Sequence, residues 1–208
     1  MAGIDPEYLK HQYLYVPWAS GTDTIAVGKA LGLYVAAQHK ARLTVVCPLK
    51  SNAGYHDEFA KLPVVTERSG QVTDGGVVLA WCPSRKVMDK MHHLDKSVVI
   101  LVEWPTENYE AWAKLVGAYN VVTGQVMTAG LSEAGMKALE GIVWEGYDGW
   151  HDSIAETLTT ARVKELAALG EYDRAIVVEY ASQHRGQTSL QRLEKILDRY
   201  ERGAAAAA

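Results

Sequence analysis

The apolar positions along the chain follow a strand pattern first and a helical pattern later. Four short runs in the first half are nearly uninterrupted and rich in β-branched side chains, which is typical of strands buried on both faces of a sheet. These runs are residues 13–16, 42–48, 77–83 and 97–105. Apolar residues at helical spacing predict helices over 24–40, 84–94 and 107–117. Strands that alternate with helices predict a parallel sheet built from right-handed crossovers.

Two weaker strands and four further helices complete the prediction. Residues 62–67 and 119–124 are short strand patterns, and Pro63 favours an edge position for the first of them. Polar residues 50–61 predict a loop with a helical turn. Helices are predicted at 131–142, at 153–169 with Gly170 as the stop, at 174–182, and from a cap at Thr188 or Ser189 onward. The apolar centre of 174–182 also fits a strand, and its helical neighbours favour a helix.

This pattern predicts a three-layer α/β fold with a mainly parallel, Rossmann-like (doubly wound) sheet and a C-terminal helical extension. We expect an α/β core over residues 1–130. The helical extension over 131–203 would pack on this core, form a lid or pair subunits. The alanine run 204–208 is set aside as a tail or cloning remnant.

Composition narrows the class of protein. The net charge of −4 over 208 residues removes the usual electrostatic reason to expect binding to nucleic acid. Cys47 and Cys82 fit neither a disulfide framework nor a zinc spacing, which favours a reducing compartment such as the cytoplasm. No apolar run approaches the ~20 residues of a bilayer span, and the N-terminus has no signal-peptide pattern, so we expect no membrane partner.

Four of the apolar runs close on proline with Trp or Cys beside it. The endings are Val16-Pro17-Trp18, Val46-Cys47-Pro48, Ala80-Trp81-Cys82-Pro83 and Glu103-Trp104-Pro105. Proline lacks the N–H that a strand ladder needs, so each strand stops there. If the strands are parallel, the endings share the carboxyl edge, where open α/β sheets bind ligands.

Three tryptophans in these endings have three interpretations. Trp18, Trp81 and Trp104 form either a platform for a planar ligand group or only a cover for the sheet end, and a protein interface is a third use. The chain has 6 Trp and 11 Tyr against one Phe, so it favours rings with a polar handle, which are frequent in clefts and interfaces.

The turn after the first strand offers groups for an anion. Ser20, Gly21, Thr22 and Thr24 combine hydroxyls with the N–H groups of a helix start, which favours phosphate or carboxylate. Asp23 can equally serve only as the N-cap. The run resembles the Ser-Gly-Gly-x-Asp-Ser loop of PP-loop ATP pyrophosphatases, with one glycine missing. The helix and strand that follow resemble the fold of universal stress proteins, without their later glycine-rich signature, and no family is assigned.

Two further positions are candidates at the same edge. Ser84 and Arg85 begin the helix after the third strong strand. A cation at a helix N-terminus is disfavoured by the helix dipole unless a bound anion, a nearby carboxylate or solvent stabilises it. Glu103 interrupts an apolar strand at its end, so it would bind a ribose hydroxyl, act as a general base, or lie in water past the rim. His56-Asp57-Glu58 and His92-His93 lack a recognised metal spacing, so no metal is predicted and no cofactor is named.

Two hypotheses of different classes follow. The first is binding of a nucleotide or similar phosphorylated small molecule at the carboxyl edge, with a hydrolase or transferase as its enzymatic version. Its ligand-binding residues would be Trp18, Ser20, Gly21, Thr22, Thr24, Trp81, Ser84, Arg85 and Trp104, with Glu103 as the catalytic group. The alternative is a non-catalytic protein-interaction module that dimerises through its C-terminal helices.

Overall fold

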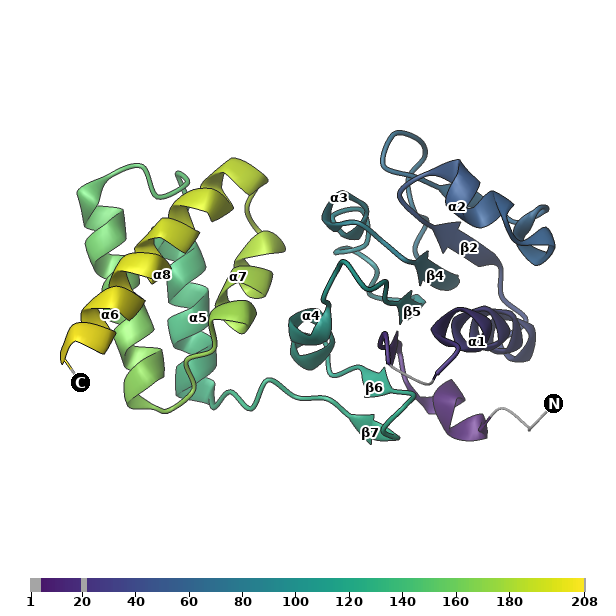
Figure 1. Ribbon diagram of the computed structural model, residues 1–208, viewed down its shortest axis with the longest axis horizontal. Helices are drawn as coiled ribbons and strands as arrows, with labels where there is room; N and C mark the ends of the chain where they lie inside the picture. The colour runs from purple at the N-terminus through teal and green to yellow at the C-terminus, as the bar shows by residue number, and fades with distance from the viewer. Residues whose placement is uncertain (1–4, 20–21, 208) are drawn as a thin grey trace. The chain divides into compact units, whose positions relative to one another are not determined.

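The computed structural model describes residues 5–19 and 22–207 (Figure 1). It divides the chain into two compact units, Met1–Thr128 and Ala129–Ala208. The first unit contains a sheet with helices on both faces, and the second contains helices. Each unit is described by itself below.

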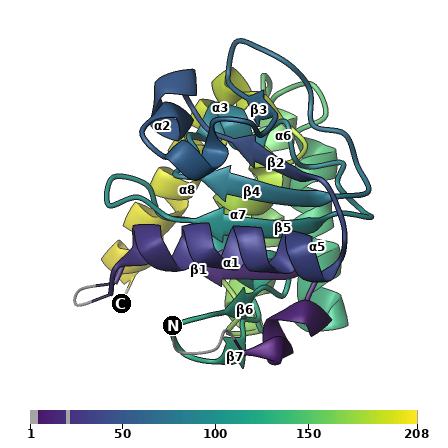
Figure 2. The same ribbon diagram turned by 90° about the vertical axis from the view of Figure 1, so that its right-hand side faces the viewer.

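Within the described residues the sheet has seven strands in the order β3-β2-β4-β5-β1-β6-β7, which can be followed from top to bottom in Figure 2. The strands are β1 (Tyr13–Val16), β2 (Leu43–Val46), β3 (Val64–Val65), β4 (Val77–Trp81), β5 (Val98–Val102), β6 (Tyr119–Asn120) and β7 (Gln125–Val126). The first six strands are mutually parallel, and β7 runs antiparallel to β6. The predicted parallel sheet is therefore confirmed, with β3 at an edge.

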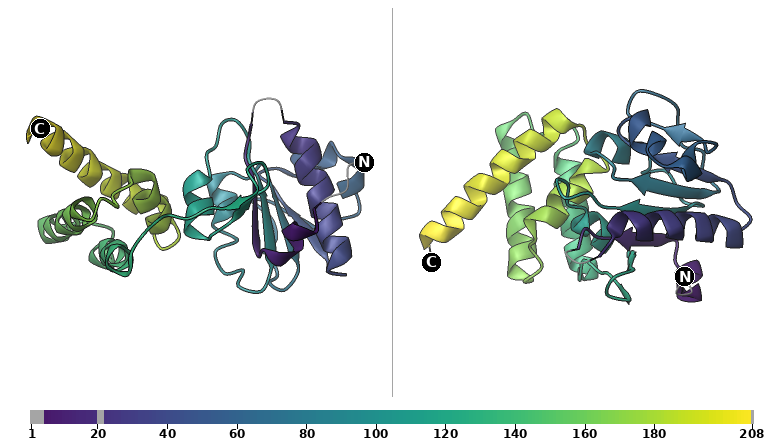
Figure 3. Two further views of the ribbon diagram at one scale, coloured as in Figure 1. Left: turned by 90° about the horizontal axis from the view of Figure 1, so that it is seen from below. Right: turned by 45° about the vertical axis from the view of Figure 1, so that its right-hand side comes forward.

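Helices cover both faces of the sheet and make three layers, which the left panel of Figure 3 shows edge-on. The helical elements of this unit are η1 (Pro6–Lys10), α1 (Thr24–Gln38), α2 (Lys50–Gly54), η2 (Asp57–Phe59), α3 (Arg85–Met88) and α4 (Glu110–Leu115). Leu79 and Ile100 of the strands pack with Leu31 of α1 on one face. Val78 and Leu101 belong to the opposite face, which packs against α3 and α4. Successive strand residues thus serve two separate cores.

Helix α1 approaches the sheet closely because glycine faces it. A Cβ on Gly28 would overlap the Val102 side chain, and one on Gly32 would meet Leu79 Cδ2 at 3.1 Å. Asp23 caps the helix, since its carboxylate accepts a hydrogen bond from the Ala26 N–H at 3.0 Å. The capping interpretation of Asp23 is confirmed.

Three elements differ from the sequence prediction. Helix α3 ends at Met88, because the chain then turns and the Lys90 ammonium donates to the Thr66 carbonyl at 2.7 Å. Helix α4 is also shorter than predicted. The strand predicted over 119–124 stops at Asn120, whose side-chain oxygen accepts hydrogen bonds from the Val122 and Thr123 N–H groups. Gly124, at φ +69°, completes the reversal into β7, which the sequence analysis did not predict.

The second unit consists, in its described part, of α5 (Glu133–Glu145), α6 (Ser153–Ala168), α7 (Arg174–Ser182) and α8 (Gln187–Ala207). Segment 174–182 is helical, as favoured, and α8 continues through the alanine run that was set aside. Helix α5 contacts α6 and α7, and α8 also contacts α6 and α7. Between α5 and α6, the buried Trp150 indole N–H donates to the Thr159 hydroxyl at 2.9 Å. Within the described residues, no helix combines the length and apolarity that crossing a membrane requires.

Candidate functional site

The sheet topology creates a crevice between β2 and β4. These strands are neighbours, but the chain leaves them in opposite directions. From β2 it passes through α2 to the edge strand β3, and from β4 it passes through α3 to β5 on the other side. Such a switch point leaves an opening at the carboxyl ends of the strands, where open α/β sheets place their ligands.

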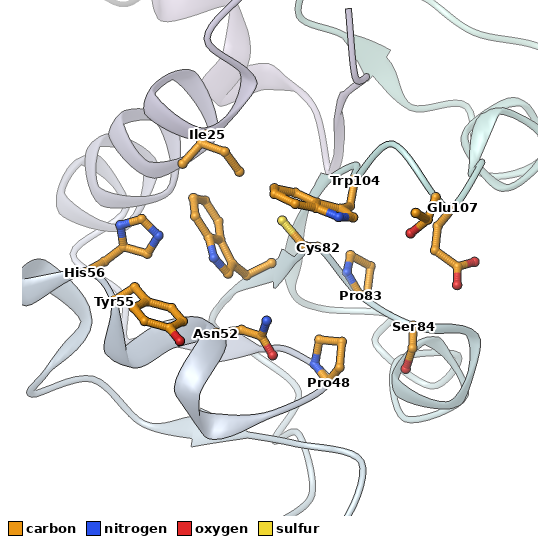
Figure 4. Close-up of a pocket in the computed structure, with 12 residues that line it drawn as sticks. Ile25, Pro48, Asn52, Tyr55, His56, Cys82, Pro83, Ser84, Trp104 and Glu107 are labelled. Carbon is orange, nitrogen blue, oxygen red and sulfur yellow. The ribbon is translucent and has the colours of Figure 1, made fainter.

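A cavity of about 510 Å³ lies at this position. Its described lining residues come from the ends of β2, β4 and β5, from the segments that follow these strands, and from the first turn of α1. Figure 4 shows ten of them with labels. They are Ile25, Pro48, Asn52, Tyr55, His56, Trp81, Cys82, Pro83, Ser84, Trp104, Thr106 and Glu107. The volume is within the range of small-molecule sites.

The proline-closed endings meet at this edge, as predicted from the sequence. Endings of β2, β4 and β5 line the cavity through Pro48, Trp81 and Trp104. The ending of β1 contributes Trp18, which packs edge-to-face on Trp104 with 5.4 Å between ring centroids. The four endings thus lie at the carboxyl edge of the sheet, and all three predicted tryptophans line the cavity or lie next to it.

The aromatic rings of the cavity differ in what they offer a ligand. Trp81 is 2% exposed and packs against His56 and Phe59 at centroid distances of 5.0 and 5.1 Å, so it forms part of the floor. Trp104 is 43% exposed and Tyr55 is 82% exposed. In Figure 4 Tyr55 lies on the α2 side and Trp104 on the β5 side. These two side chains have ring surface left for stacking.

The polar groups of the lining are few and mostly uncharged. Asn52, Ser84 and Thr106 are neutral, Glu107 is acidic, and Tyr55 and His56 add a hydroxyl and an imidazole. The Ser84 hydroxyl already donates to a carboxylate oxygen of Glu67. Among the described lining residues none is Lys or Arg. The cavity therefore suits an uncharged planar group better than a phosphate.

Cys82 occupies a strained position in the cavity wall. Its φ is +46°, a left-handed conformation that side chains other than Gly, Asn and Asp adopt at a cost. Burial, and then the neighbouring Cys47, raise the pKa of the Cys82 thiol to about 12. Burial raises the pKa of Cys47 to about 11. Both thiols are free and stay protonated at neutral pH, which makes them poor nucleophiles.

Glu103 is 7% exposed and lies just beyond β5. One carboxylate oxygen accepts hydrogen bonds from the Tyr15 hydroxyl at 2.7 Å and the Tyr109 N–H at 2.9 Å, and the other accepts from the Trp18 N–H at 2.9 Å. Burial and then this carboxylate raise the pKa of Tyr15. The interpretation of Glu103 as a solvated rim residue is wrong. Its contacts join three segments, and its predicted catalytic role stays a prediction.

Of the residues in the predicted anion-binding turn, Thr22 and Thr24 are not among the described lining residues of the cavity. Ser20 and Gly21 lie outside the described residues. The Thr24 hydroxyl donates to the Pro17 carbonyl at 3.2 Å, and the Thr24 N–H donates to the Thr22 carbonyl at 2.9 Å. Ile25, in the first turn of α1, does line the cavity, so the start of this helix borders it.

Arg85 points toward the loop between β5 and α4. Its guanidinium donates to the Asn108 carbonyl at 2.8 Å and lies 4.7 Å from the centre of the Tyr109 ring. Arg85 is exposed, so the cation at the start of α3 is stabilised by solvent together with these protein partners, and its predicted role as an anion contact stays a prediction.

Several lining residues were not predicted from the sequence. Asn52, Tyr55 and His56 follow the proline that closes β2, and Thr106 and Glu107 follow the proline beyond β5. The available signal was this position directly after a strand ending, where loops of parallel sheets contact ligands.

No metal site or known relative adds to this picture. Across residues 5–19 and 22–207, no group of three or more His, Cys, Asp or Glu side chains could hold a metal ion. Searches of protein-family models, of curated proteins and of solved structures found no match to this chain.

Proposed function

We propose that the cavity at the carboxyl ends of β2, β4 and β5 binds a nucleotide or a similar phosphorylated small molecule through its planar ring. The observation that carries the proposal is the position of the cavity. A 510 Å³ hollow with accessible Trp104 and Tyr55 rings lies at the switch point of a parallel sheet. Aromatic rings hold planar groups by stacking, whatever their substituents.

The phosphate of such a ligand would lie outside the cavity. Glu107 repels an anion, and no Lys or Arg stands among the described lining residues to offset it. Helix α1, with 15 residues, begins beside the cavity at Thr24 and Ile25, and its dipole places partial positive charge at that end, which the capping Asp23 carboxylate partly offsets. In the proposed arrangement, the planar ring of the ligand lies inside the cavity and its phosphate points toward the start of α1. The groups described here support binding, and the proposal does not include a reaction.

A thermal-shift panel of nucleosides, nucleotides and phosphosugars tests the proposal. A ligand that binds only the folded state at one hundred times its Kd stabilises it by about 2.7 kcal/mol. We expect nucleosides and nucleotides to raise the Tm and phosphosugars without a ring base to have little effect. Trp104→Leu should abolish the shift, because it removes the exposed stacking surface.

Trp144→Leu is the matched control. Trp144 is 76% exposed and belongs to α5 of the second unit, outside the cavity lining. This variant should keep the full shift. If no compound that carries a ring base stabilises the protein, or if Trp104→Leu responds like wild type, the proposed function is wrong.

One observation favours the alternative, a protein-interaction module that dimerises through the C-terminal helices. Four large apolar side chains at the α5–α6 end are exposed: Trp144, Tyr147, Ile154 and Leu158. Exposed apolar patches of this kind often mark protein interfaces. Light scattering across a concentration series should then show a dimer, and Ile154→Ser with Leu158→Ser should return it to a monomer. A monomer at all concentrations would reject this alternative.

A further inference from the structure

The Asn52 side chain is fixed by the chain segment that precedes α2. Its amide oxygen accepts a hydrogen bond from the Leu49 N–H at 2.9 Å, and the Asn52 N–H donates to the Leu49 carbonyl at 2.9 Å. The amide oxygen is therefore committed to the backbone, and the plane of the amide is set by this contact.

The chemistry of the amide then decides which atom is left for the cavity. Only the oxygen can accept from an N–H, so the atom that faces Leu49 must be the oxygen, and the other must be the NH₂ group with two donors. Asn52 lines the cavity, and in Figure 4 its nitrogen points to the side where Cys82 lies while its oxygen points away. The cavity thus presents a fixed hydrogen-bond donor at its α2 side.

We infer that Asn52 makes this cavity select planar rings that carry a carbonyl oxygen on the edge facing α2, over rings with an amino group at that position. This inference rests on the proposed function, because it assigns the ring class that the same site takes. An amino group there would place donor against donor, and a polar group that loses its partner on binding weakens the complex.

The test compares nucleosides that exchange a carbonyl for an amino group. Uridine is compared with cytidine, and inosine with adenosine, by calorimetric titration of the full chain. We expect the carbonyl member of at least one pair to bind about tenfold more tightly or better. Asn52→Asp should reverse this preference. Aspartate keeps an oxygen for the Leu49 N–H and replaces the donor with an acceptor, so the unfolding temperature should stay close to that of wild type.

Asn108→Asp is the matched control. Asn108 is exposed in the loop before α4, and its side-chain oxygen accepts from the Glu110 N–H at 2.9 Å, so the substitution makes the same chemical change outside the lining. Its ratio of carbonyl to amino affinity should equal that of wild type.

The outcomes separate this inference from the function that it deepens. If nucleosides bind in a Trp104-dependent way and Asn52→Asp leaves the ratio unchanged, or weakens both members equally, the inference is wrong and the proposed function stands. If neither nucleosides nor nucleotides bind the wild type, both are wrong.

Discussion

Glu103 shows how one buried side chain can join distant parts of the chain. Its carboxylate serves donors that lie 88 and 85 positions away along the sequence, at Tyr15 and Trp18, together with the nearby Tyr109 N–H. Hydrogen bonds to a charged acceptor are roughly twice as strong as neutral ones. This residue therefore holds the start of the β5–α4 loop, including Trp104, against β1.

We expect Glu103→Gln to lower the free energy of unfolding by about 1–3 kcal/mol. Whichever way the new amide turns, its NH₂ group faces a backbone N–H, that of Trp18 or that of Tyr109. Urea denaturation followed by tryptophan fluorescence measures the change. Glu107→Gln, a half-buried residue of the cavity lining, serves as the control and should leave the midpoint nearly unchanged. Equal midpoints for both variants would contradict the structural role of Glu103.

The two thiols give a prediction about pH. Their pKa values are raised to about 11 for Cys47 and about 12 for Cys82, so folding favours the protonated forms. The stability that this provides is present below the pKa of the unfolded thiol, ~9, and is lost as the pH rises through 11 and 12. At about pH 8, alkylation of the native thiols should be slower than in urea by roughly two to three powers of ten. Reaction at the unfolded rate would contradict the burial of both groups.

For single residues, the sequence predicted which positions lie at the site better than it predicted the groups that each side chain contacts. Glu103 was singled out because it interrupts an apolar strand, and the tryptophans because they adjoin prolines. The partners of Glu103 could not be predicted, since two of them are backbone N–H groups of loops. Asn52 was missed for a related reason, because its orientation depends on a backbone contact with Leu49.

Among the elements, α1 shows a conflict between helix propensity and packing. Gly28 costs the helix about 1 kcal/mol relative to alanine, yet a Cβ there would overlap Val102 of β5. We expect Gly28→Ala to lower the free energy of unfolding by about 1–2 kcal/mol, because overpacking outweighs the gain in propensity. Gly54→Ala in α2, where an added Cβ meets nothing within 4 Å, should have little effect.

The double variant Gly28→Ala with Val102→Ala checks the cause. If the overlap is responsible, the two substitutions together should cost less than the sum of their separate costs in urea denaturation. A simple sum would show that the two side chains do not compete for the same space.

Strong elements were predictable and short ones were not. Strands β1, β2, β4 and β5 carry continuous apolar runs, so burial on both faces determines them from the sequence alone. Helix α3 was predicted too long, because Lys90 turns the chain back onto the loop after β3. Strand β7 has only two residues, and the turn at Asn120 and Gly124 determines it.

For the molecule as a whole, the division into two units predicts two independent unfolding events. Gly28→Ala should destabilise only the first unit. Thr159→Val should destabilise only the second by about 1–3 kcal/mol, because it leaves the buried Trp150 indole N–H without its acceptor. Hydrogen exchange measured by mass spectrometry in increasing urea would report both units separately. A single transition that moves with either variant would contradict independent folding.

The general location of the site could be predicted from topology, whereas its lining could not. Parallel strands that stop at proline must present their ends on one edge, so the location follows from the strand pattern. The cavity itself depends on how α2 and the loop after β5 lie over that edge, and no periodic pattern in the sequence encodes this placement.

Strand β1 pairs with β5 and β6, so its partners are synthesised after β2, β3 and β4. Tyr13 lies opposite Val99, a separation of 99 − 13 = 86 positions. During translation β1 therefore leaves the ribosome before the strands with which it pairs. Its backbone groups stay hydrated until most of the sheet unit has been synthesised. Contacts this distant slow folding, and a nascent chain that stops before residue 98 would have no parallel neighbour for β1.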